Sequence, residues 1–443
     1  MAHNVAYNPH MRTHPLRPRL VDEIHARPPV PLDAPTLVSF LACMHDENDP
    51  QADRRHIDAL YTRLGQTPPD NEEALHLLVD GGNFLLKWER HIEFSSYAFF
   101  TRPQHAFCSG ETALQYLPAD WVEAIPGQLV VAAHVDLFPS ETVQPNALLA
   151  TLSATGEAVV ATRVASDSAW VFSDFRQHGD FTRFVVLDDG CGRFRAGRTV
   201  QRILEIETYR TVALLAFPVA REVGRLIDRA EAELASLIDR MGTAASAEDD
   251  RAVLKDLTRL AAEVEHSVVN SNRRFSAAIA YYRLVQQRIG ELGEGKVGNN
   301  PSLKSFMERR LAPALGTVDA ISRQQEELSA RIARTSQLLR TRVDIELEQQ
   351  NQELLAQMNR RTRLQLRLQQ TVEGLSIAAI TYYASQLVHY LAKGAKELGW
   401  SPLAPEIVTA VSIPCIALAV AFAGRKLRRK LAQADAEPAA TTH

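Results

Sequence analysis

The segment TVEGLSIAAITYYASQLVHYLAKG, residues 371–394, decides how the rest of this chain is interpreted. With His389 neutral, residues 374–391 carry no charge, which is about the minimum length of a helix that crosses a hydrocarbon core of roughly 30 Å. A second segment, IVTAVSIPCIALAVAFAG at residues 407–424, also has no charged residue. The two segments predict a C-terminal transmembrane hairpin with helices at about 372–392 and 407–424, because the link between them is too short to hold a domain.

The charges beside the two segments predict their orientation. The basic sequence NRRTRLQLRLQQ precedes the first segment and GRKLRRKL follows the second, whereas the link AKGAKELGWSPLAPE has two lysines and two glutamates. Positively charged flanks stay in the cytoplasm. We therefore expect a multi-pass protein of the inner membrane with both termini inside. Two buried helices of a soluble core are the alternative, which would not explain the basic flanks.

The first segment carries one small and polar stripe. Its members recur at i, i+4, i+7, i+11 and i+15, and they are Gly374, Ala378, Thr381, Ser385 and His389. Such groups are costly in hydrocarbon unless they face another helix or water. The stripe is therefore either a packing seam against the second helix or the lining of a pore made by several copies. Arg367 and Glu373 would lie near the cytoplasmic mouth of that pore. The sequence identifies no metal, since one imidazole per chain is no ligand set.

The N-terminal half has the patterns of an α+β domain. Residues 1–35 predict an extended arm rich in Pro, Arg and His, with a helical turn at VDEIHAR, and residues 36–199 predict the domain itself. A helix is expected at residues 50–64, and further helices at EEALHLLVD and TALQYLPADWVEAI. Strands are expected in FLLKWERHIEFSSYAFFT, GQLVVAAHVDLF, EAVVATRVA, AWVFSDF and RFVVLDDG. The turn DDGCGR predicts a hairpin between strands.

Residues 200–371 predict a bundle of long helices that ends in a stalk. The first helix should kink at Pro218, the second should cover about residues 249–290, and the third should begin near Ser302 with a bend at Pro313. The third helix has small or apolar residues every three or four positions, at Ile321, Leu328, Ile332, Thr335, Leu339, Val343, Leu347, Leu354 and Met358. This spacing fits packing within one chain and is compatible with self-association. Residues 425–443 are expected to form a basic and then flexible cytoplasmic tail.

Composition excludes several classes of function. The net charge of −4 gives no electrostatic reason to expect nucleic acid as a partner. The four cysteines lie far apart and form no metal or disulfide pattern. The chain has no GxxxxGK[ST], GxSxG or HExxH motif and no GxGxxG after an expected strand, so we expect no cofactor and no enzyme activity.

One polar cluster in the N-terminal half is a candidate ligand site. In WERHIEF, strand alternation would place Glu89, His91 and Glu93 on one face of the sheet. Carboxylates and an imidazole together can bind a ligand or a metal. A solvated sheet face with ion pairs between strands is the alternative.

Several phrases of the sequence resemble a known family. These phrases are RPRLVDEIHARPP, LLKWERHIEFSSYAFF and the segment 371–394 with the helix that follows it. They are similar to a bacterial family of membrane-anchored proteins of unknown function, domain of unknown function 3422. That resemblance covers nearly the whole chain, implies a bacterial membrane anchor and implies no activity or catalytic residue.

A looser likeness concerns the order of the elements. A cytoplasmic domain, long helices, a stalk that becomes a membrane helix, and a second membrane helix are similar to the CorA-type magnesium transporters. That likeness implies a homo-oligomer whose first membrane helix lines an ion pore. The Gly-Met-Asn motif of those transporters is absent, and the matching place reads HYLAKGAKELGW. The leading hypothesis is thus a homo-oligomeric ion channel or transporter for an unidentified ion. The alternative is a non-conducting, membrane-anchored sensor or scaffold with a cytoplasmic domain that binds a ligand or partner.

Overall fold

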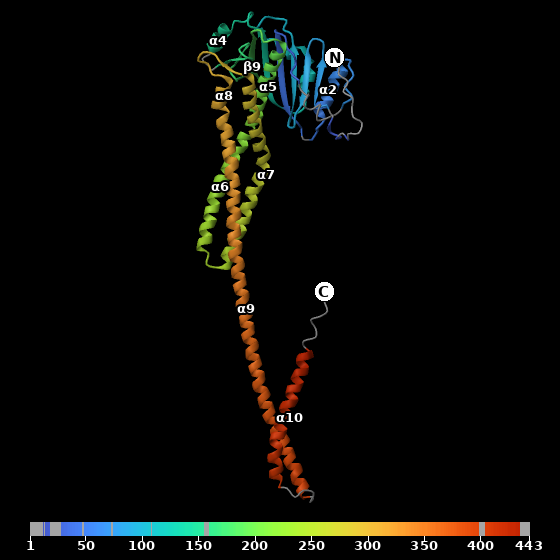
Figure 1. The fold of residues 1–443 in the computed structure, drawn as a ribbon, viewed down its shortest axis with the longest axis vertical. Coiled ribbons are helices and arrows are strands. Elements are labelled where there is room, and N and C mark those ends of the chain that lie inside the picture. Colours follow the sequence, from blue (N-terminus) through green and yellow to red (C-terminus); the bar gives the residue numbers. More distant parts are fainter. Residues whose placement is uncertain are drawn as a thin grey trace. The chain divides into compact units, whose positions relative to one another are not determined.

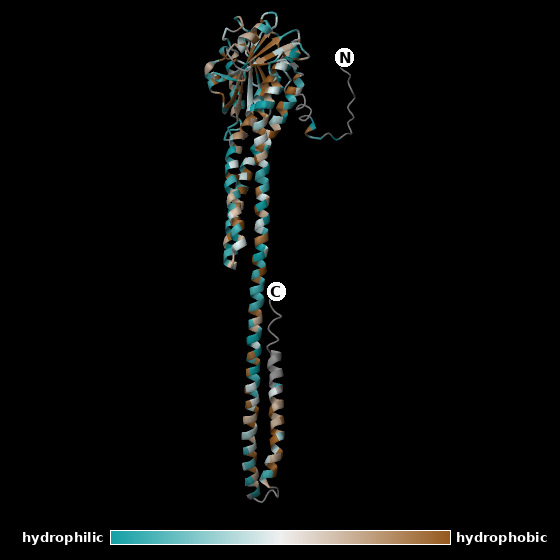
Figure 2. Cartoon of the chain, turned by 90° about the vertical axis from the view of Figure 1, so that its left-hand side faces the viewer, coloured by the Kyte–Doolittle hydropathy of each residue, from teal (hydrophilic) through white to brown (hydrophobic). Residues whose placement is uncertain are grey.

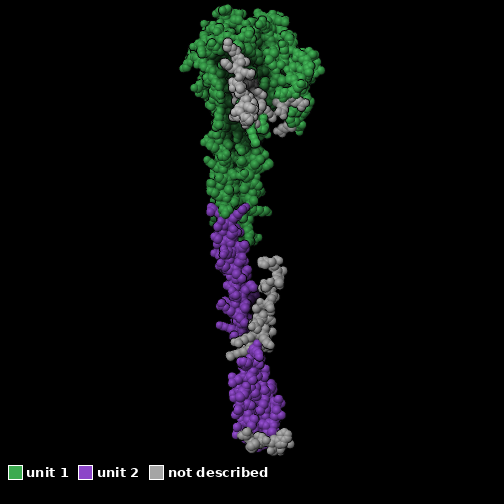
Figure 3. All heavy atoms as spheres, turned by 45° about the vertical axis from the view of Figure 1, so that its right-hand side comes forward, with its two compact units in different colours: residues 1–337 green, residues 338–443 purple. Residues whose placement is uncertain are grey.

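The computed structural model divides the chain into two compact units, residues 1–337 and 338–443 (Figure 3). The residues it describes are 12, 14–17, 28–46, 48–71, 74–107, 109–154, 159–397 and 404–434. The helical turn expected at VDEIHAR and residues 398–403 of the link between the two apolar segments lie outside these ranges.

The first unit is built on a ten-stranded sheet (Figure 1). Its strands are β1 (Thr36–Met44), β2 (His76–Asp80), β3 (Leu85–Arg90), β4 (Phe94–Thr101), β5 (Gln128–Pro139), β6 (Val160–Val164), β7 (Ala169–Ser173), β8 (Gln177–His178), β9 (Phe181–Asp188) and β10 (Gly295–Lys296). They lie in the order β10-β6-β7-β9-β5-β1-β4-β3-β2, with β8 beside β9. Only β5 and β9 pair in parallel, and every other pairing in the described sheet is antiparallel.

Helices complete the first unit and lead into the second. They are α2 (Ala52–Arg63), a short 3-10 helix (Ala113–Tyr116), α3 (Ala119–Glu123), α4 (Pro145–Ser153), α5 (Arg193–Leu214), α6 (Ala216–Thr243), α7 (Ala247–Leu292), α8 (Leu303–Arg310), α9 (Ala312–Glu397) and α10 (Pro405–Ala434). Ser246 and Ser302 begin α7 and α8 as N-caps, since each hydroxyl accepts a hydrogen bond from the backbone N–H three residues later. The fold class is α+β with long helices after the sheet, as the sequence predicts.

The two faces of the sheet are covered by different elements. On one face, Ile57 and Leu60 of α2 pack with the aromatic core residues Trp88, Phe99 and Trp121. On the other face lies α5, which follows β9 directly along the chain. Figure 2 colours the strands mostly as hydrophobic, which is expected of a sheet that is covered on both sides. The site described below lies between the sheet and α5.

Three local predictions were wrong. The run EEALHLLVD contains strand β2 and not a helix, because its buried residues alternate with period two at Leu77 and Val79. The run WERHIEF is not one strand: β3 ends at Arg90, and the His91 N–H donates to the Phe94 carbonyl across a tight turn. The turn DDGCGR leads from β9 into α5 and not into another strand. The run TALQYLPADWVEAI is helical as predicted, in two short helices. Strand β1 was not predicted.

The second unit consists of the later part of α9 and α10. Among the described residues, one stretch is long and apolar enough to cross a membrane, Pro405–Gly424 of α10, and apart from Pro405 its residues are not buried. The end of α9 does not meet the same criterion, since it includes Gln386, His389 and three tyrosines. Of the two expected spanning helices, one is therefore found by length and composition.

Candidate functional site

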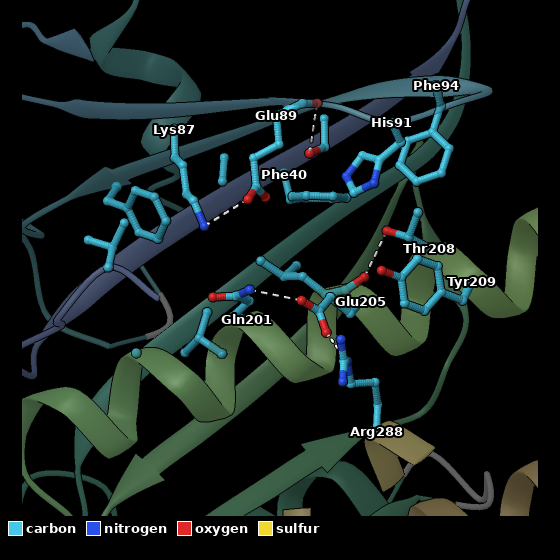
Figure 4. Close-up of a pocket in the computed structure, with 17 residues that line it drawn as sticks. Phe40, Lys87, Glu89, His91, Phe94, Gln201, Glu205, Thr208, Tyr209 and Arg288 are labelled. Atoms are coloured by element: carbon cyan, nitrogen blue, oxygen red, sulfur yellow. Dashed lines mark hydrogen bonds and ion pairs between the residues drawn. The ribbon is translucent and has the colours of Figure 1, made fainter. Parts of the chain in front are cut away.

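A cavity of about 280 Å³ lies between the sheet and α5 (Figure 4). Strands β1, β3 and β4 form one wall, and α5 with one residue of α7 forms the other. Its apolar lining includes Phe40, Phe94, Ala98, Phe100, Val200 and Leu204. Its polar lining includes Lys87, Glu89, His91, Gln201, Glu205, Thr208, Tyr209 and Arg288.

The segment before β1 closes one side of this cavity. The Leu32 N–H donates to the Arg193 carbonyl at 3.0 Å, which fixes the segment against the start of α5. At Gly197 the segment passes so close that a Cβ there would collide with the Val30 carbonyl. Glycine is required at this position because the two backbones touch.

Four charged side chains of the cavity form two opposite pairs. Lys87 Nζ lies 3.0 Å from Glu89 Oε1 and also donates to the Pro28 carbonyl at 2.9 Å. On the opposite wall, the Arg288 guanidinium donates to Glu205. Burial alone would lower the pKa of Arg288, but the adjacent Glu205 carboxylate raises it above its ordinary value. The two pairs cancel, so their net contribution to the charge of the cavity is zero.

Two polar atoms in the cavity retain unused hydrogen-bonding capacity. Gln201 Nε2 donates to Glu205 Oε1 at 2.8 Å, while Gln201 Oε1 is buried and accepts no hydrogen bond from the described residues. A buried polar atom without a partner costs about 1–3 kcal/mol. Lys87 Nζ donates to the Pro28 carbonyl and lies 3.0 Å from Glu89 Oε1, a second buried oxygen that accepts no hydrogen bond from the described residues. The cavity thus offers buried acceptors, Gln201 Oε1 and Glu89 Oε1, and the Lys87 ammonium as a donor to a bound molecule.

The structure separates the three ligand candidates in WERHIEF. Glu89 and His91 both line the cavity, where the His91 ring stacks on Phe94 with the ring centroids 4.4 Å apart. Glu93 instead forms an ion pair with Arg274 of α7 at 2.9 Å and lines a different hollow. The turn after β3 causes this separation. Among the described residues, no group of three or more His, Cys, Asp or Glu side chains could hold a metal ion.

The sequence did not lead us to the cavity residues that α5 and α7 contribute. Gln201, Glu205 and Thr208 follow one another at i, i+4 and i+7, so they share one face of α5. That spacing of polar residues on a helix with buried neighbours was the available signal. Arg288 could not be found in this way, since it meets Glu205 from 83 residues away.

The expected pore stripe divides into two parts in the second unit. Thr381 and Ser385 are buried, with 8% and 6% of their surfaces exposed, and their hydroxyls donate to carbonyls of their own helix. His389 Nδ1 lies 3.0 Å from Thr409 Oγ1 of α10. Gly374 and Ala378 are exposed instead.

The two residues expected at the pore mouth differ in their surroundings. The Glu373 carboxylate lies beside Gly424 of α10, whereas Arg367 is exposed. Contacts at both ends, Glu373 with Gly424 and His389 with Thr409, show that α9 and α10 run antiparallel here.

The comparisons with known proteins identify one family. The family model described as Protein of unknown function (DUF3422) matches residues 12–431. No curated protein and no solved structure matches the chain.

Proposed function

Because the chain belongs to the family described as Protein of unknown function (DUF3422), which names no activity, we propose a function from the geometry of its own residues. The proposal is a membrane-anchored sensor whose N-terminal sheet domain binds a small organic ligand in the cavity under α5. The observation that carries it is the buried acceptor Gln201 Oε1, which faces a cavity with a donor on the opposite wall.

The lining of the cavity supports one class of ligand. Its volume of about 280 Å³ is just below the usual range for small-molecule sites, which begins near 300 Å³. The two charge pairs cancel, so the ligand should carry no net charge. Phe40 and Phe100 favour an apolar or aromatic body, while Gln201 Oε1 and Lys87 Nζ favour one donor and one acceptor on it.

The C-terminal helices support the anchoring half of the proposal. In it, α10 crosses the membrane, and the end of α9 crosses beside it as an antiparallel hairpin. Contact with α10 would satisfy His389 and shelter Thr381 and Ser385, which reduces the cost of placing them in hydrocarbon. The basic flanks, with Arg367 before the hairpin and Lys426 after it, favour cytoplasmic placement of both termini.

Ion transport is the second candidate, and the geometry favours it less. The residues expected to line a pore, Thr381, Ser385 and His389, lie on the side of α9 that faces α10. That arrangement is typical of a packing seam between membrane helices. A conducting pore would have to use another face of α9.

Binding to the cavity can be tested with a matched pair of variants. The full-length protein in detergent would be screened against neutral small metabolites by thermal shift, and affinities of the hits would be measured by calorimetry. Gln201→Leu should weaken binding by roughly tenfold, since one hydrogen bond contributes about 1.4 kcal/mol. Gln287→Leu is the control, because Gln287 donates to Glu291 in the same i, i+4 geometry outside the cavity.

A second variant tests whether the bound compounds occupy the cavity. Ala98→Leu should reduce the cavity volume without removing a polar contact, since Ala98 lines the cavity from β4. The proposal is rejected if bound compounds are insensitive to both Gln201→Leu and Ala98→Leu.

A further inference from the structure

We propose that residues 28–32, called the strap, are a gate on the cavity under α5 and open to admit the ligand. The strap precedes β1 along the chain and has contacts with both the sheet and α5. The inference rests on the proposed ligand site and adds to it the route by which the ligand enters. The strap is the most weakly held wall of the cavity.

The strap touches both walls of the cavity. On the sheet side, Lys87 Nζ of β3 donates to the Pro28 carbonyl at 2.9 Å. On the helix side, the Leu32 N–H donates to the carbonyl of the first residue of α5 at 3.0 Å, and the Val30 carbonyl lies against Gly197. Val30 itself lines the cavity between these two contacts. Movement of the strap would therefore uncover the interior at Val30.

Few hydrogen bonds hold the strap in place. Its sequence is PPVPL, and prolines, which have no N–H to donate, occupy the first, second and fourth positions. Among the described residues, the strap has one hydrogen bond at each end, to Lys87 and to α5. Pro28 is exposed, whereas Leu32 is buried. The strap is thus anchored at Leu32 and held more loosely toward Pro28.

The junction of α5 and α7, where other lining side chains are partly exposed, is held more firmly. Arg288 of α7 donates to Glu205 of α5 and, at 3.0 Å, to Glu291. Arg202 of α5 donates to the Glu291 backbone carbonyl at 2.8 Å. Hydrogen bonds between charged groups are stronger than those between neutral groups. Opening at this junction would break several such bonds between two long helices, so the strap is the easier route.

Opening the strap leaves no buried charge without a partner. Lys87 is 7% exposed, and its ammonium lies 3.0 Å from Glu89 Oε1 as well as beside the Pro28 carbonyl (Figure 4). When Pro28 moves away, the Glu89 carboxylate still compensates the charge. The Pro28 carbonyl can accept hydrogen bonds from water, because Pro28 is already exposed. The N–H that Lys87 gave to Pro28 then becomes available to an acceptor on the ligand.

The prolines of the strap favour its return to the closed position. Each proline ring fixes φ near −65°, so the detached strap has few conformations. It therefore loses little conformational entropy when it closes again. Only residues 33–35 separate the strap from β1, which keeps its detached end close to the cavity.

Cysteine accessibility in the full-length protein in detergent, without ligand, tests the gate. Ser96→Cys places a thiol in the cavity with little change in side-chain size, since Ser96 lines it and is 3% exposed. The native Cys43 is 5% exposed and is the internal reference. It pairs with Ser95, whose hydroxyl donates to Asp53 of α2 on the other face of the sheet. Labelling by N-ethylmaleimide would be followed at each thiol separately by mass spectrometry.

Gly197→Ala, added to Ser96→Cys, should open the gate. The new Cβ would collide with the Val30 carbonyl, so the strap must move, while alanine favours the helix at this position. Labelling of Ser96→Cys should accelerate roughly tenfold, with Cys43 unchanged. Gly316→Ala in α9 is the matched control and should change neither rate, since a Cβ there meets no atom within 4 Å.

Pro29→Gly is a second, milder variant that leaves α5 unchanged. Glycine gives the open strap more conformations, so labelling of Ser96→Cys should rise roughly threefold. Unchanged labelling of Ser96→Cys in both variants, an equal rise at Cys43, or an equal rise in Gly316→Ala would each overturn the gate. No ligand is used, so such a result would leave the ligand site itself standing, which Gln201→Leu tests separately.

Discussion

The sheet domain and the C-terminal helices treat apolar side chains in opposite ways. In the sheet domain, large residues such as Trp88, Phe99 and Leu137 are fully buried by other parts of the same chain. In the second unit, Leu387, Leu418 and Phe422 are exposed, although their composition is that of a core. The first region can fold on its own surfaces, whereas the second needs a bilayer or another protein to cover it.

Polar groups in the two regions also differ, in whether the chain itself supplies their hydrogen-bond partners. The Glu111 carboxylate in the sheet domain is buried and accepts hydrogen bonds from the Gln104 and His105 backbone N–H groups at 2.9 Å and from the Tyr116 hydroxyl. Gln386 in the second unit is exposed in an apolar stretch. Gln386 therefore depends on water or on another molecule for its hydrogen bonds.

The largest effect on stability should come from comparing the truncation of one buried leucine of α9 with that of one exposed leucine of the same helix. Leu328→Ala removes a fully buried side chain and should lower the free energy of unfolding by about 2–5 kcal/mol. Leu354→Ala, on the same helix but exposed, should change it by less than about 0.5 kcal/mol. Urea unfolding followed by the fluorescence of Trp88, Trp121 and Trp170 measures both. Equal losses would show that Leu354 is covered within the chain.

A smaller loss of stability should follow from replacing Glu111 or from lowering the pH. Burial alone would raise the pKa of Glu111, but the hydrogen bonds from Gln104, Tyr116 and His105 lower it to about 2. Because the folded pKa lies below the ordinary value near 4.5, stability from this group is present above pH 4.5 and is lost as the pH falls toward 2. Glu111→Gln should cost about 1–3 kcal/mol at pH 7.

The pH dependence itself provides the check on Glu111. The stability difference between the wild-type protein and Glu111→Gln, measured by urea unfolding, should shrink between pH 4.5 and the lowest pH at which folding is retained. A constant difference over that range would mean that the Glu111 charge contributes nothing.

The long helices were predicted well from sequence because their signal is repeated over many turns. The second expected helix, about residues 249–290, is α7 (Ala247–Leu292), and the predicted bend at Pro313 follows the break between α8 and α9 at Leu311. Strands β1 and β2 were not predicted as strands, since a short apolar run fits a helix or a strand equally well. Their identity depends on the strands they pair with.

The candidate site could be predicted only in part. Glu89 and His91 lie close together in the sequence, so their pattern was visible. Gln201 and Arg288 join them only because α5 and α7 pack against the sheet, and no local pattern encodes that contact.

The native Cys415 offers the most direct test of the claim that a bilayer covers the exposed apolar residues of the second unit. Cys415 lies within the apolar stretch of α10 and is exposed in the structure. In Cys108→Ala protein, sonicated membranes would be treated with a water-soluble maleimide, with Ile92→Cys, 91% exposed in the sheet domain, as the reference. The account predicts rapid labelling of Ile92→Cys and labelling of Cys415 only after detergent is added. Labelling of Cys415 at the same rate as Ile92→Cys in intact membranes would contradict it.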